Sequence, residues 1–335
     1  MRKTKKTSGV TNKVKKAKSI VLKTNDLRDL GAEVTGYFNH SAVPINILMF
    51  IDNSADQEVS ATVRNLFMTK SINVKLQISY FSQAAEIMDE TADMAVIVAG
   101  AGSEGFEIAT NCRKKAIPCC VVTKEDEVID LESSIIKKFD GDVFYLNAID
   151  KEAVKDIKEK LGAWIAVVCA TKKFAYSKAF PFVAGPIARE IVHLTSIENA
   201  AIAMVPFIGG ADFPIMLINQ MKMLAQIAAV YGVKLDYSLL KEAAGVMVVA
   251  LFGRRCFKII HKIIPLPRFV ISAPVTLVTT ETIGHALIAY FDAGGNAEGL
   301  LSLLQKSVFG ASVVKETASP AIQAIKGAVL AKQVK

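Results

Sequence analysis

The first apolar run of the chain, Ile45–Ile51, leads into a loop that is rich in carboxylates. A loop that binds nucleotide phosphates needs glycines, whose backbone N–H groups wrap the phosphates, and a lysine for the β and γ oxygens. The loop Asp52-Asn53-Ser54-Ala55-Asp56-Gln57-Glu58 has neither residue type, and its acids repel a triphosphate. The sequence therefore argues against tight magnesium-nucleotide binding at this loop, and more strongly against GTP hydrolysis.

A later apolar run, Cys119–Thr123, ends in residues of the types that read a nucleotide base. The segment Thr123-Lys124-Glu125-Asp126 resembles the Asn/Thr-Lys-x-Asp motif of Era-like GTPases, in which the aspartate accepts hydrogen bonds from guanine. The resemblance implies that Thr123, Lys124 and Asp126 bind a guanine nucleotide. A solvated loop after a strand explains the same residues, so both interpretations stay open.

A second resemblance involves the first run and its acid. The segment Ile47-Leu48-Met49-Phe50-Ile51-Asp52 and the later Gly105 are similar to a response-regulator receiver domain. That family keeps a phosphoacceptor aspartate at the end of its third strand, where this chain has Val98-Ala99-Gly100. Under either resemblance the residues that carry the chemistry are missing, so we predict a degenerate domain that is not an enzyme.

The segment Arg254–Ile264 separates basic from apolar side chains. At about 100° per residue, its cations fall within about 120° of arc and its apolar side chains lie opposite. This pattern is typical of a helix that lies among anionic lipid headgroups, although a surface helix covering a core is the alternative. The predicted membrane-interface residues are Arg254, Arg255, Phe257, Lys258, Ile260, Lys262 and Ile264.

Two ionisable residues, Glu281 and His285, interrupt the apolar segment that runs from Phe269 to Tyr290. They are four residues apart, so on a helix they share one face. If this segment lies in a membrane, they form a buried polar pair that offsets the cost of burying a charge. If it does not, the same face meets water or a partner helix. The uncharged runs are shorter than the 18 or so residues that indicate a spanning helix.

The elements that would position these residues follow from the hydrophobic pattern. Five apolar runs of strand length alternate with amphipathic helical stretches, which predicts a parallel sheet covered on both faces. The fold class is therefore α/β: a five-stranded, mostly parallel doubly wound sheet of the GTPase or flavodoxin-like type, followed by an all-α apolar helical domain. The predicted strands are Ile45–Ile51, Val74–Tyr80, Met94–Ala99, Cys119–Thr123 and Val143–Leu146.

The net charge of +8 is concentrated at the amino terminus. Residues 1–28 hold ten Lys or Arg and one acid, which leaves 30 basic and 31 acidic residues in the remainder. Such a leader is either solvated and disordered or attracted to an anionic lipid surface. No aromatic residue interleaves with its charges before Tyr37, so nucleic acid is not a predicted partner. The five cysteines lack zinc-ligand spacing and read as buried apolar residues, so we predict no metal and no cofactor.

The helical half resembles the YcjF-type family of helical domains, known as domain of unknown function six-ninety-seven, from about Glu198 to Gly295. The resemblance rests on several separated segments in order: Ala200–Phe207, Ala211-Asp212, Gln220-Met221, Tyr231-Gly232, Thr279–Ala286 and Tyr290-Phe291. Such domains often follow Era-like GTPase domains and are often described as membrane proteins. The resemblance thus implies a degenerate Era-like domain, lacking its phosphate-binding loop, in the first half.

We therefore divide the chain into a disordered basic leader (1–42), a degenerate GTPase-like α/β domain (43–172), an apolar helical, membrane-associated domain (173–297) and a C-terminal helical tail (298–335). The favoured hypothesis is a non-catalytic adaptor or scaffold at the cytoplasmic side of a membrane, with a membrane surface or bilayer and an unidentified protein as partners. One alternative is a guanine-nucleotide-responsive switch with residual binding. Another is a soluble homo-oligomeric scaffold whose apolar helices pack against copies of themselves.

Overall fold

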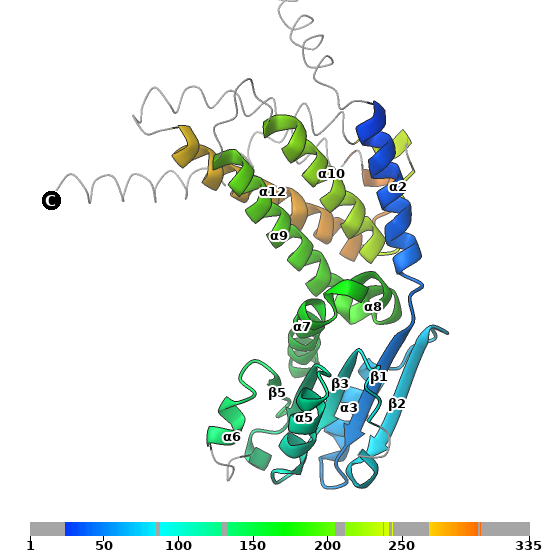
Figure 1. The fold of residues 1–335 in the computed structure, drawn as a ribbon, viewed down its shortest axis with the longest axis vertical. Coiled ribbons are helices and arrows are strands. Elements are labelled where there is room, and N and C mark those ends of the chain that lie inside the picture. The colour runs from blue at the N-terminus through cyan, green and yellow to red at the C-terminus, as the bar shows by residue number, and fades with distance from the viewer. Residues whose placement is uncertain are drawn as a thin grey trace, which may run out of the picture. The chain divides into compact units, whose positions relative to one another are not determined.

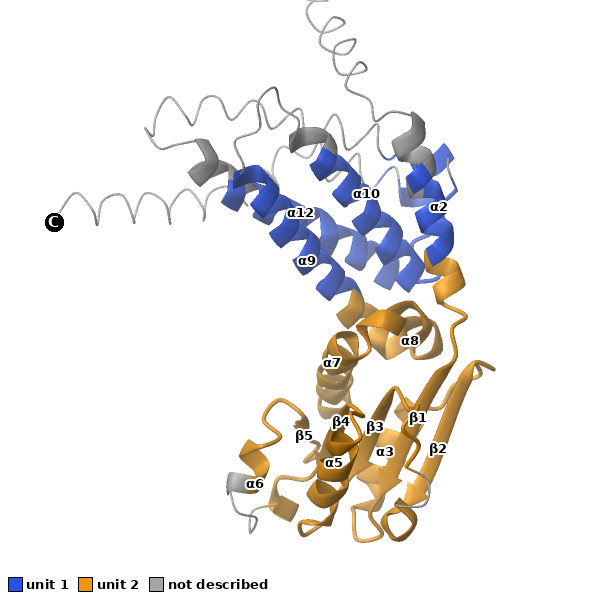
Figure 2. Cartoon of the chain, viewed as in Figure 1, with its two compact units in different colours: residues 1–36, 188–335 blue, residues 37–187 orange. Residues whose placement is uncertain are grey.

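The computed structural model describes residues 24–84, 88–128, 133–204, 212–236, 238–240, 243, 268–300 and 302. The chain divides into two compact units: unit 1 holds residues 1–36 and 188–335, and unit 2 holds residues 37–187 (Figure 2). The boundary falls inside helix α2 (Thr24–His40) and inside helix α9 (Ala184–Met204).

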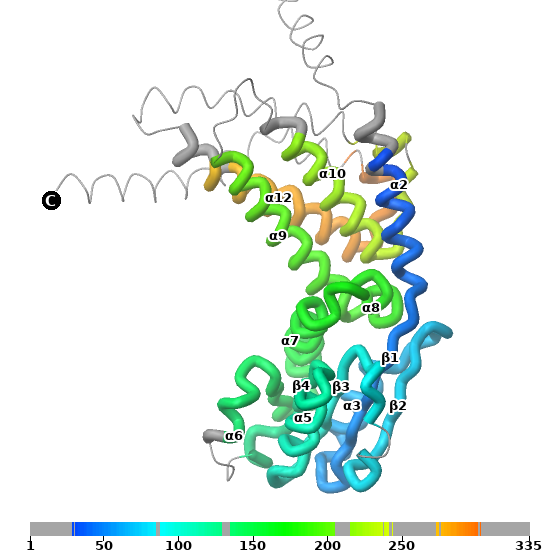
Figure 3. Tube along the Cα trace, in the orientation of Figure 1, coloured from blue at the N-terminus to red at the C-terminus, as the bar shows by residue number. Residues whose placement is uncertain are grey.

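Unit 2 is built on a five-stranded sheet with the order β2-β1-β3-β4-β5 (Figures 1 and 3). Every neighbouring pair is parallel, and Ile47 of β1 lies opposite Leu76 of β2 and Met94 of β3. The predicted α/β fold with a mostly parallel sheet is confirmed. The strands are β1 (Ile45–Ile51), β2 (Val74–Tyr80), β3 (Met94–Val98), β4 (Cys119–Thr123) and β5 (Val143–Tyr145).

The central strands are buried on both faces. All of β3 and β4 is buried, and in β1 only Asn46 is partly exposed. A strand without a solvent face needs apolar side chains at successive positions, so it reads as a continuous apolar run. The connections between such parallel strands must cross over the sheet, and they carry helices that cover it.

Helices cover the two faces of the sheet separately. On one face, α5 (Glu104–Lys114) packs Phe106 and Cys112 into a cluster with Leu48 and Phe50 of β1. On the other face, α3 (Gln57–Leu66) contacts β3 and α7 (Lys151–Val168) contacts β5. The remaining elements of this part of unit 2 are the short helices η1 (Phe81–Gln83), η2 (Asp126–Val128) and α6 (Ser133–Lys137).

The amino edge of the sheet is held by a polar network. Asp93 accepts a hydrogen bond from the backbone N–H of Asn46 at 2.8 Å and pairs with the Lys172 ammonium at 2.6 Å. Lys172 also donates to the Pro44 carbonyl oxygen at 2.9 Å. This network ties the start of β1 and the start of β3 to the segment that follows α7.

Unit 2 extends past the predicted end of the α/β domain. After η3 (Ala170–Lys172), helix α8 (Lys173–Ala179) and η4 (Pro181–Val183) stay with the sheet. Their aromatic side chains pack on residues of α2 and of the end of α3: Phe67 lies 5.4 Å from Phe180 and 5.8 Å from Phe182 between ring centroids, and Tyr37 stacks on Phe174 at 5.1 Å. The predicted boundary at residue 172 is therefore replaced by one at residue 187.

The described cysteines are buried thiols in unit 2. Cys112, Cys119, Cys120 and Cys169 are all free and buried, as the sequence predicts, and Cys256 lies outside the described residues. Burial raises the pKa of the Cys120 thiol well above its usual range and raises that of Cys169 to about 11. These groups therefore remain protonated at neutral pH.

Part of the segment that we expected to be a disordered leader is a helix. The leader was predicted to reach residue 42, but Thr24–His40 forms α2, so that prediction is wrong from Thr24 onward. The reason is tertiary packing: Val34 and Tyr37 are buried, and burial of an apolar face stabilises the segment as a helix. Residues 1–23 lie outside the described residues.

Unit 1 is helical in its described part, and α9 is joined there by α10 (Asp212–Val230) and α12 (Arg268–Asp292). Lys222 of α10 pairs with Glu33 of α2 at 2.9 Å, which ties these two helices together. After α10 the chain adopts a left-handed conformation at Gly232, with φ at 74°, which glycine accommodates readily at the end of a helix. Of the predicted C-terminal tail, 298–335, the structure describes only residues 298–300 and 302.

Polar residues are embedded where the helices of unit 1 meet. Asn199 of α9 donates to the Thr280 hydroxyl of α12 at 3.4 Å and accepts from the Asn219 amide of α10 at 3.2 Å. Nearby on α12, Gly284 lies directly against Val192 of α9. Among the residues that the structure describes, no helix combines the length and the apolar character needed to cross a membrane.

The close approach of α12 to α9 predicts opposite effects for one substitution at two helical glycines. A Cβ at Gly284 would lie 2.4 Å from a Val192 methyl carbon, whereas a Cβ at Gly36 in α2 has nothing within 4 Å. We expect Gly284→Ala to lower the free energy of unfolding by about 1–2 kcal/mol through overpacking. Gly36→Ala should raise it by about 0.5–1 kcal/mol, because alanine loses less backbone entropy in a helix.

The measurement is urea unfolding of both variants followed by far-UV circular dichroism. Gly36→Ala is the matched control, because it makes the same chemical change in another helix of this chain. Equal shifts in the same direction for the two variants would show that the contact at Val192 is not tight.

Candidate functional site

The candidate site is the carboxyl edge of the sheet in unit 2. The strand order reverses direction between β1 and β3, and doubly wound sheets bind ligands in the crevice beyond the strand ends at such a switch point. Here the chain leaves β1 at Asp52, leaves β3 at Ala99 and leaves β4 at Lys124. Because all strands are parallel, these three loops lie at one edge.

The loops after β1 and β3 close against each other at this switch point. The Asp52 carboxylate accepts from the backbone N–H of Ser54 at 2.9 Å and from that of Gly100 at 3.1 Å. A Cβ at Gly100 would lie 2.4 Å from the Ser54 hydroxyl oxygen and 2.6 Å from the Ala55 nitrogen. The backbone donors that could meet a phosphate here are thus bonded to Asp52, and protein atoms fill the space between the loops.

Lys124 is held by the carboxylate that caps α3. Its ammonium lies 2.5 Å from Oδ2 of Asp56, and Oδ1 of Asp56 accepts from the backbone N–H groups of Glu58 at 2.8 Å and Val59 at 3.2 Å. The hydrogen bond from Lys124 lowers the pKa of Asp56, and the same bond raises the pKa of Lys124. A helix N-terminus is a natural site for phosphate, and in α3 an internal carboxylate occupies it.

The predicted nucleotide-binding residues share one loop but do not converge. The Thr123 hydroxyl is buried and donates to Oε2 of Glu127 at 3.2 Å. Lys124 turns to Asp56, while Asp126 is exposed in η2. Between Lys124 and Asp126, Glu125 is fixed by a hydrogen bond from its backbone N–H to the Asn147 side-chain oxygen at 2.8 Å. The loop is therefore well ordered by its own polar contacts.

Some of these partners were not predictable as partners. The type and position of Asp56 signal a helix cap, but 68 residues separate it from Lys124 and nothing in the sequence links them. The same holds for Asn147, which lies 22 residues from Glu125. Only the parallel sheet, which gathers the strand ends at one edge, brings these groups together.

The predicted polar pair of α12 is formed. Nε2 of His285 lies 3.2 Å from Oε2 of Glu281, as their four-residue spacing predicts. In the chain by itself the side chain of Glu281 is 25% exposed and that of His285 is 56% exposed, so burial of the pair in a membrane stays a prediction. A second imidazole joins them: Nδ1 of His193, on α9, lies 3.6 Å from Oε1 of Glu281. Sequence reasoning missed His193 because it is on another helix.

The predicted membrane-interface residues lie outside the described residues. The arrangement of the basic and apolar faces of that segment therefore stays a prediction. The predicted membrane-interface residues are Arg254, Arg255, Phe257, Lys258, Ile260, Lys262 and Ile264. Within the described part of the chain, no group of three or more His, Cys, Asp or Glu could hold a metal ion.

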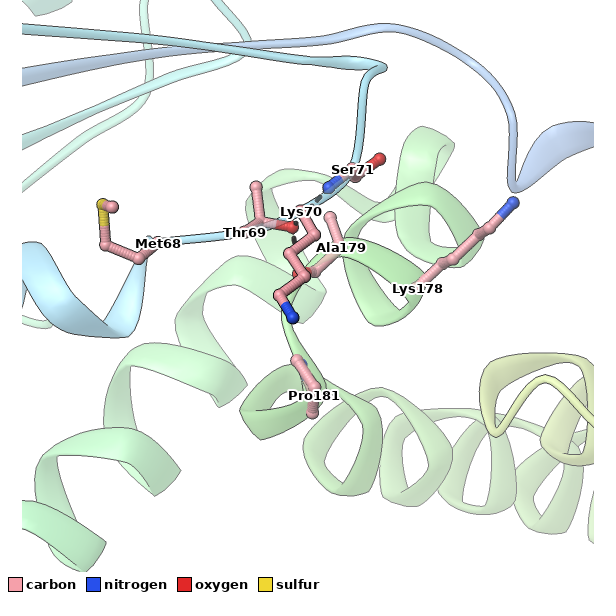
Figure 4. A pocket seen from close by; sticks show the side chains of 7 residues that line it. All are labelled: Met68, Thr69, Lys70, Ser71, Lys178, Ala179 and Pro181. Atoms are coloured by element: carbon pink, nitrogen blue, oxygen red, sulfur yellow. Dashed lines mark hydrogen bonds between the residues drawn. The ribbon is translucent and has the colours of Figure 1, made fainter.

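A pocket of 380 Å³ lies at the amino-terminal side of β2, at the end of the sheet opposite to Lys124 (Figure 4). Thr69 shapes it by donating to the Ala179 carbonyl oxygen at 2.9 Å and accepting from the Ser71 N–H at 3.1 Å. In Figure 4, Lys70 reaches toward Pro181 while Lys178 points away. The lining residues are Met68, Thr69, Lys70, Ser71, Lys178, Ala179 and Pro181.

The rim of this pocket combines cations with exposed apolar side chains. Of the lining residues, Met68 is 65% exposed, and Lys70 and Lys178 are both exposed. Ile72, which follows the lining residue Ser71 in the chain, is 97% exposed. None of the residues that line the pocket is an acid. The arrangement suits contact with an anionic surface and offers no pair of groups for acid–base chemistry.

Comparison of the chain with protein-family models gives no match, and comparison with curated proteins gives none either. What the chain does is therefore inferred from its own geometry. At the carboxyl edge, the Asp56 carboxylate accepts hydrogen bonds from the N-terminus of α3, and the Asp52 carboxylate accepts them from the loops after β1 and β3.

The pair formed by Lys124 and Asp56 predicts a specific pH dependence of stability. Because Lys124 lowers the pKa of Asp56 below its usual 3.8, the pair stabilises the fold above that value. This stabilisation is lost as the pH falls through the folded-state pKa. Asp56→Asn keeps a capping side chain but removes the ion pair, so its urea midpoint should be below wild type at neutral pH and should approach it below pH 3.8.

Unfolding can be followed by the fluorescence of Trp164, the single tryptophan, which is buried in unit 2 and donates to Asp142 at 2.8 Å. The control is Asp150→Asn, at the cap of α7, where Asp150 makes no ion pair among the described residues. That variant should show little change at either pH. Identical neutral-pH midpoints for Asp56→Asn and wild type would contradict a stabilising pair.

Proposed function

We propose that this chain is a non-catalytic adaptor associated with the cytoplasmic side of a membrane, and that its α/β unit binds a protein partner. One observation carries the first part: Asp56 occupies the N-terminus of α3 and pairs with Lys124. A nucleotide phosphate would have to displace this carboxylate and its lysine from the place where it would bind. The site thus favours a structural role for the loops that would otherwise do chemistry. The degenerate Era-like and YcjF-type relationship is part of the same proposal.

Charge and exposed apolar groups support the membrane part. The basic leader and the segment Arg254–Ile264 carry the pattern expected at anionic headgroups. In the described part of unit 2, Lys70 and Lys178 line the same pocket as the exposed Met68, and the exposed Ile72 follows two residues after Lys70 in the chain. Exposed apolar residues next to cations can enter a headgroup layer while the cations meet the phosphates.

A second candidate function is a guanine-nucleotide switch. It is favoured by one observation: the Asp126 carboxylate is exposed at the carboxyl edge, next to the ordered residues Thr123 and Lys124. A guanine base could meet Asp126 without displacing Asp56. Such binding would lack phosphate contacts and would therefore be weak.

Calorimetry separates the two functions. We expect titration of the full chain with GTP or GDP and magnesium to give no heat, because the phosphate contacts are replaced by Asp56. The comparison variant is Asp126→Ala, which should behave as wild type. Heat with wild type that disappears in Asp126→Ala would overturn the adaptor proposal in favour of the switch.

Flotation with liposomes tests the membrane part. The full chain should float with anionic vesicles and remain behind with zwitterionic ones. At about 1 kcal/mol per cation near such a surface, Lys70→Ala with Lys178→Ala should weaken binding by about thirtyfold. Lys155→Ala with Lys158→Ala removes the same charge from exposed positions on α7 and should have a smaller effect.

Alkaline and high-salt washes of the floated protein add a second readout. Release by salt indicates electrostatic attachment, and retention through both washes indicates inserted helices. Absence of the wild-type chain from anionic vesicles would overturn the membrane proposal.

A further inference from the structure

The strand β2 forms one margin of the sheet in unit 2 (Figure 1). It pairs with β1 on one side, and no described strand pairs with its other side. Its seven residues, Val74–Tyr80, contain neither proline nor glycine. An edge strand of this length presents a row of backbone donors and acceptors to any strand that approaches.

The register between β1 and β2 determines which backbone groups of β2 point away from β1. Ile45 lies opposite Val74 and donates from its backbone N–H to the Asn73 carbonyl oxygen at 2.8 Å. In a parallel ladder, alternate residues of one strand bond to its neighbour, so Asn73 and every second residue after it face β1. The residues whose N–H and C=O groups point away from β1 are Val74, Leu76, Ile78 and Tyr80.

The same four residues form an apolar row on one face of β2, because side chains alternate along a strand. Ile78 is 43% exposed and Tyr80 is 53% exposed. Natural edge strands are usually protected by charges, proline or a bulge. In β2 the only charge is Lys75, which sits near the start of the strand and pairs with Asp89 at 3.2 Å.

We propose that a second copy of this chain pairs with β2 in the antiparallel direction, with a two-fold axis at Gln77. This register uses the whole strand and sets Leu76 opposite the partner's Ile78, and Val74 opposite the partner's Tyr80. On the other face, Lys75 meets the partner's Ser79, so no two lysines face each other. Apolar side chains therefore meet apolar ones along the face that holds Val74, Leu76, Ile78 and Tyr80, and the two sheets become one continuous sheet.

Gln77 provides an independent argument for this axis. Its side-chain oxygen is enclosed and has no hydrogen-bond partner. A buried polar atom without a partner is unfavourable and calls for an explanation. At the two-fold axis each Gln77 lies beside the partner's Gln77, and the two amides can turn to donate to each other.

A second copy fits this edge better than an unrelated peptide does. Pairing of the strand with itself places apolar residues opposite apolar ones on one face and Gln77 opposite Gln77 at the centre, and closed two-fold dimers are the commonest assembly of soluble proteins. An unrelated strand would need the same apolar alternation and a matching amide at its centre. The dimer needs no lipid, so its test is independent of the membrane proposal.

Disulfide trapping tests the register in the full chain with Cys256→Ser as background. In a non-hydrogen-bonded antiparallel pair the two Cα atoms are about 4.5 Å apart, which suits a disulfide. Oxidation with diamide should therefore convert Gln77→Cys into a covalent dimer of twice 36.2 kDa. Lys75→Cys is the control: its distance to the partner's position 75 is about 13 Å, although its side chain is 57% exposed in wild type.

Trapping of Lys75→Cys as readily as Gln77→Cys would overturn the register, and a monomeric Gln77→Cys would overturn the pairing. Analytical ultracentrifugation without lipid gives a second measurement on unmodified chains. Wild type should sediment as a dimer and Ile78→Lys as a monomer. Ile72→Lys, at a position that is 97% exposed but outside β2, should remain dimeric. A wild-type chain that stays monomeric across the concentration series would refute the proposal.

Discussion

Burial of both faces of the central strands β1 and β3 determines most of what unit 2 presents at its surface. A sheet with no wet face must place its connections above and below it, so its strands run parallel and their carboxyl ends gather at one edge. The same constraint leaves only the edge strands, β2 and β5, with backbone groups that no described strand pairs with. β5 is three residues long, whereas β2 has seven. The two surfaces that we assign roles to, the carboxyl edge and the margin at β2, are thus consequences of one packing requirement.

At each end of the sheet, one carboxylate accepts one or more hydrogen bonds from backbone N–H groups and also forms an ion pair with a lysine. At the amino edge Asp93 accepts from the Asn46 N–H and pairs with Lys172. At the carboxyl edge Asp56 caps α3 and pairs with Lys124. A carboxylate in this position substitutes for an external anion, because it satisfies the N–H groups of a helix or loop and neutralises the nearby cation. At the carboxyl edge, where doubly wound sheets commonly bind a ligand, internal carboxylates therefore satisfy the backbone donors and the lysine.

The sequence was most informative where one local pattern decides the structure. β1, β2 and β4 begin and end where the apolar runs predicted. For β1 and β4 the reason is that a strand buried on both faces has little freedom in composition. The boundary after α7 was misplaced because Phe174, Phe180 and Phe182 have the same apolar character whether they pack in unit 2, as they do on Tyr37 and Phe67, or in unit 1. For the candidate site, the residues of the β4 loop were found, but their partners were not. Asp56 and His193 meet Lys124 and Glu281 only through folding, and no local pattern records contacts across such separations.

The burial of the thiols in unit 2 also controls how fast they can be alkylated. Alkylating reagents react with the thiolate, and burial keeps the pKa of Cys120 and Cys169 high and shields both sulfurs. Modification of either one must wait for the surrounding structure to open, so its rate measures local unfolding and not intrinsic reactivity. Cys120 lies in the middle of the sheet and Cys169 at the end of α7. The alkylation rate of Cys120 therefore reports the opening of the core, and that of Cys169 reports the detachment of the segment that follows α7.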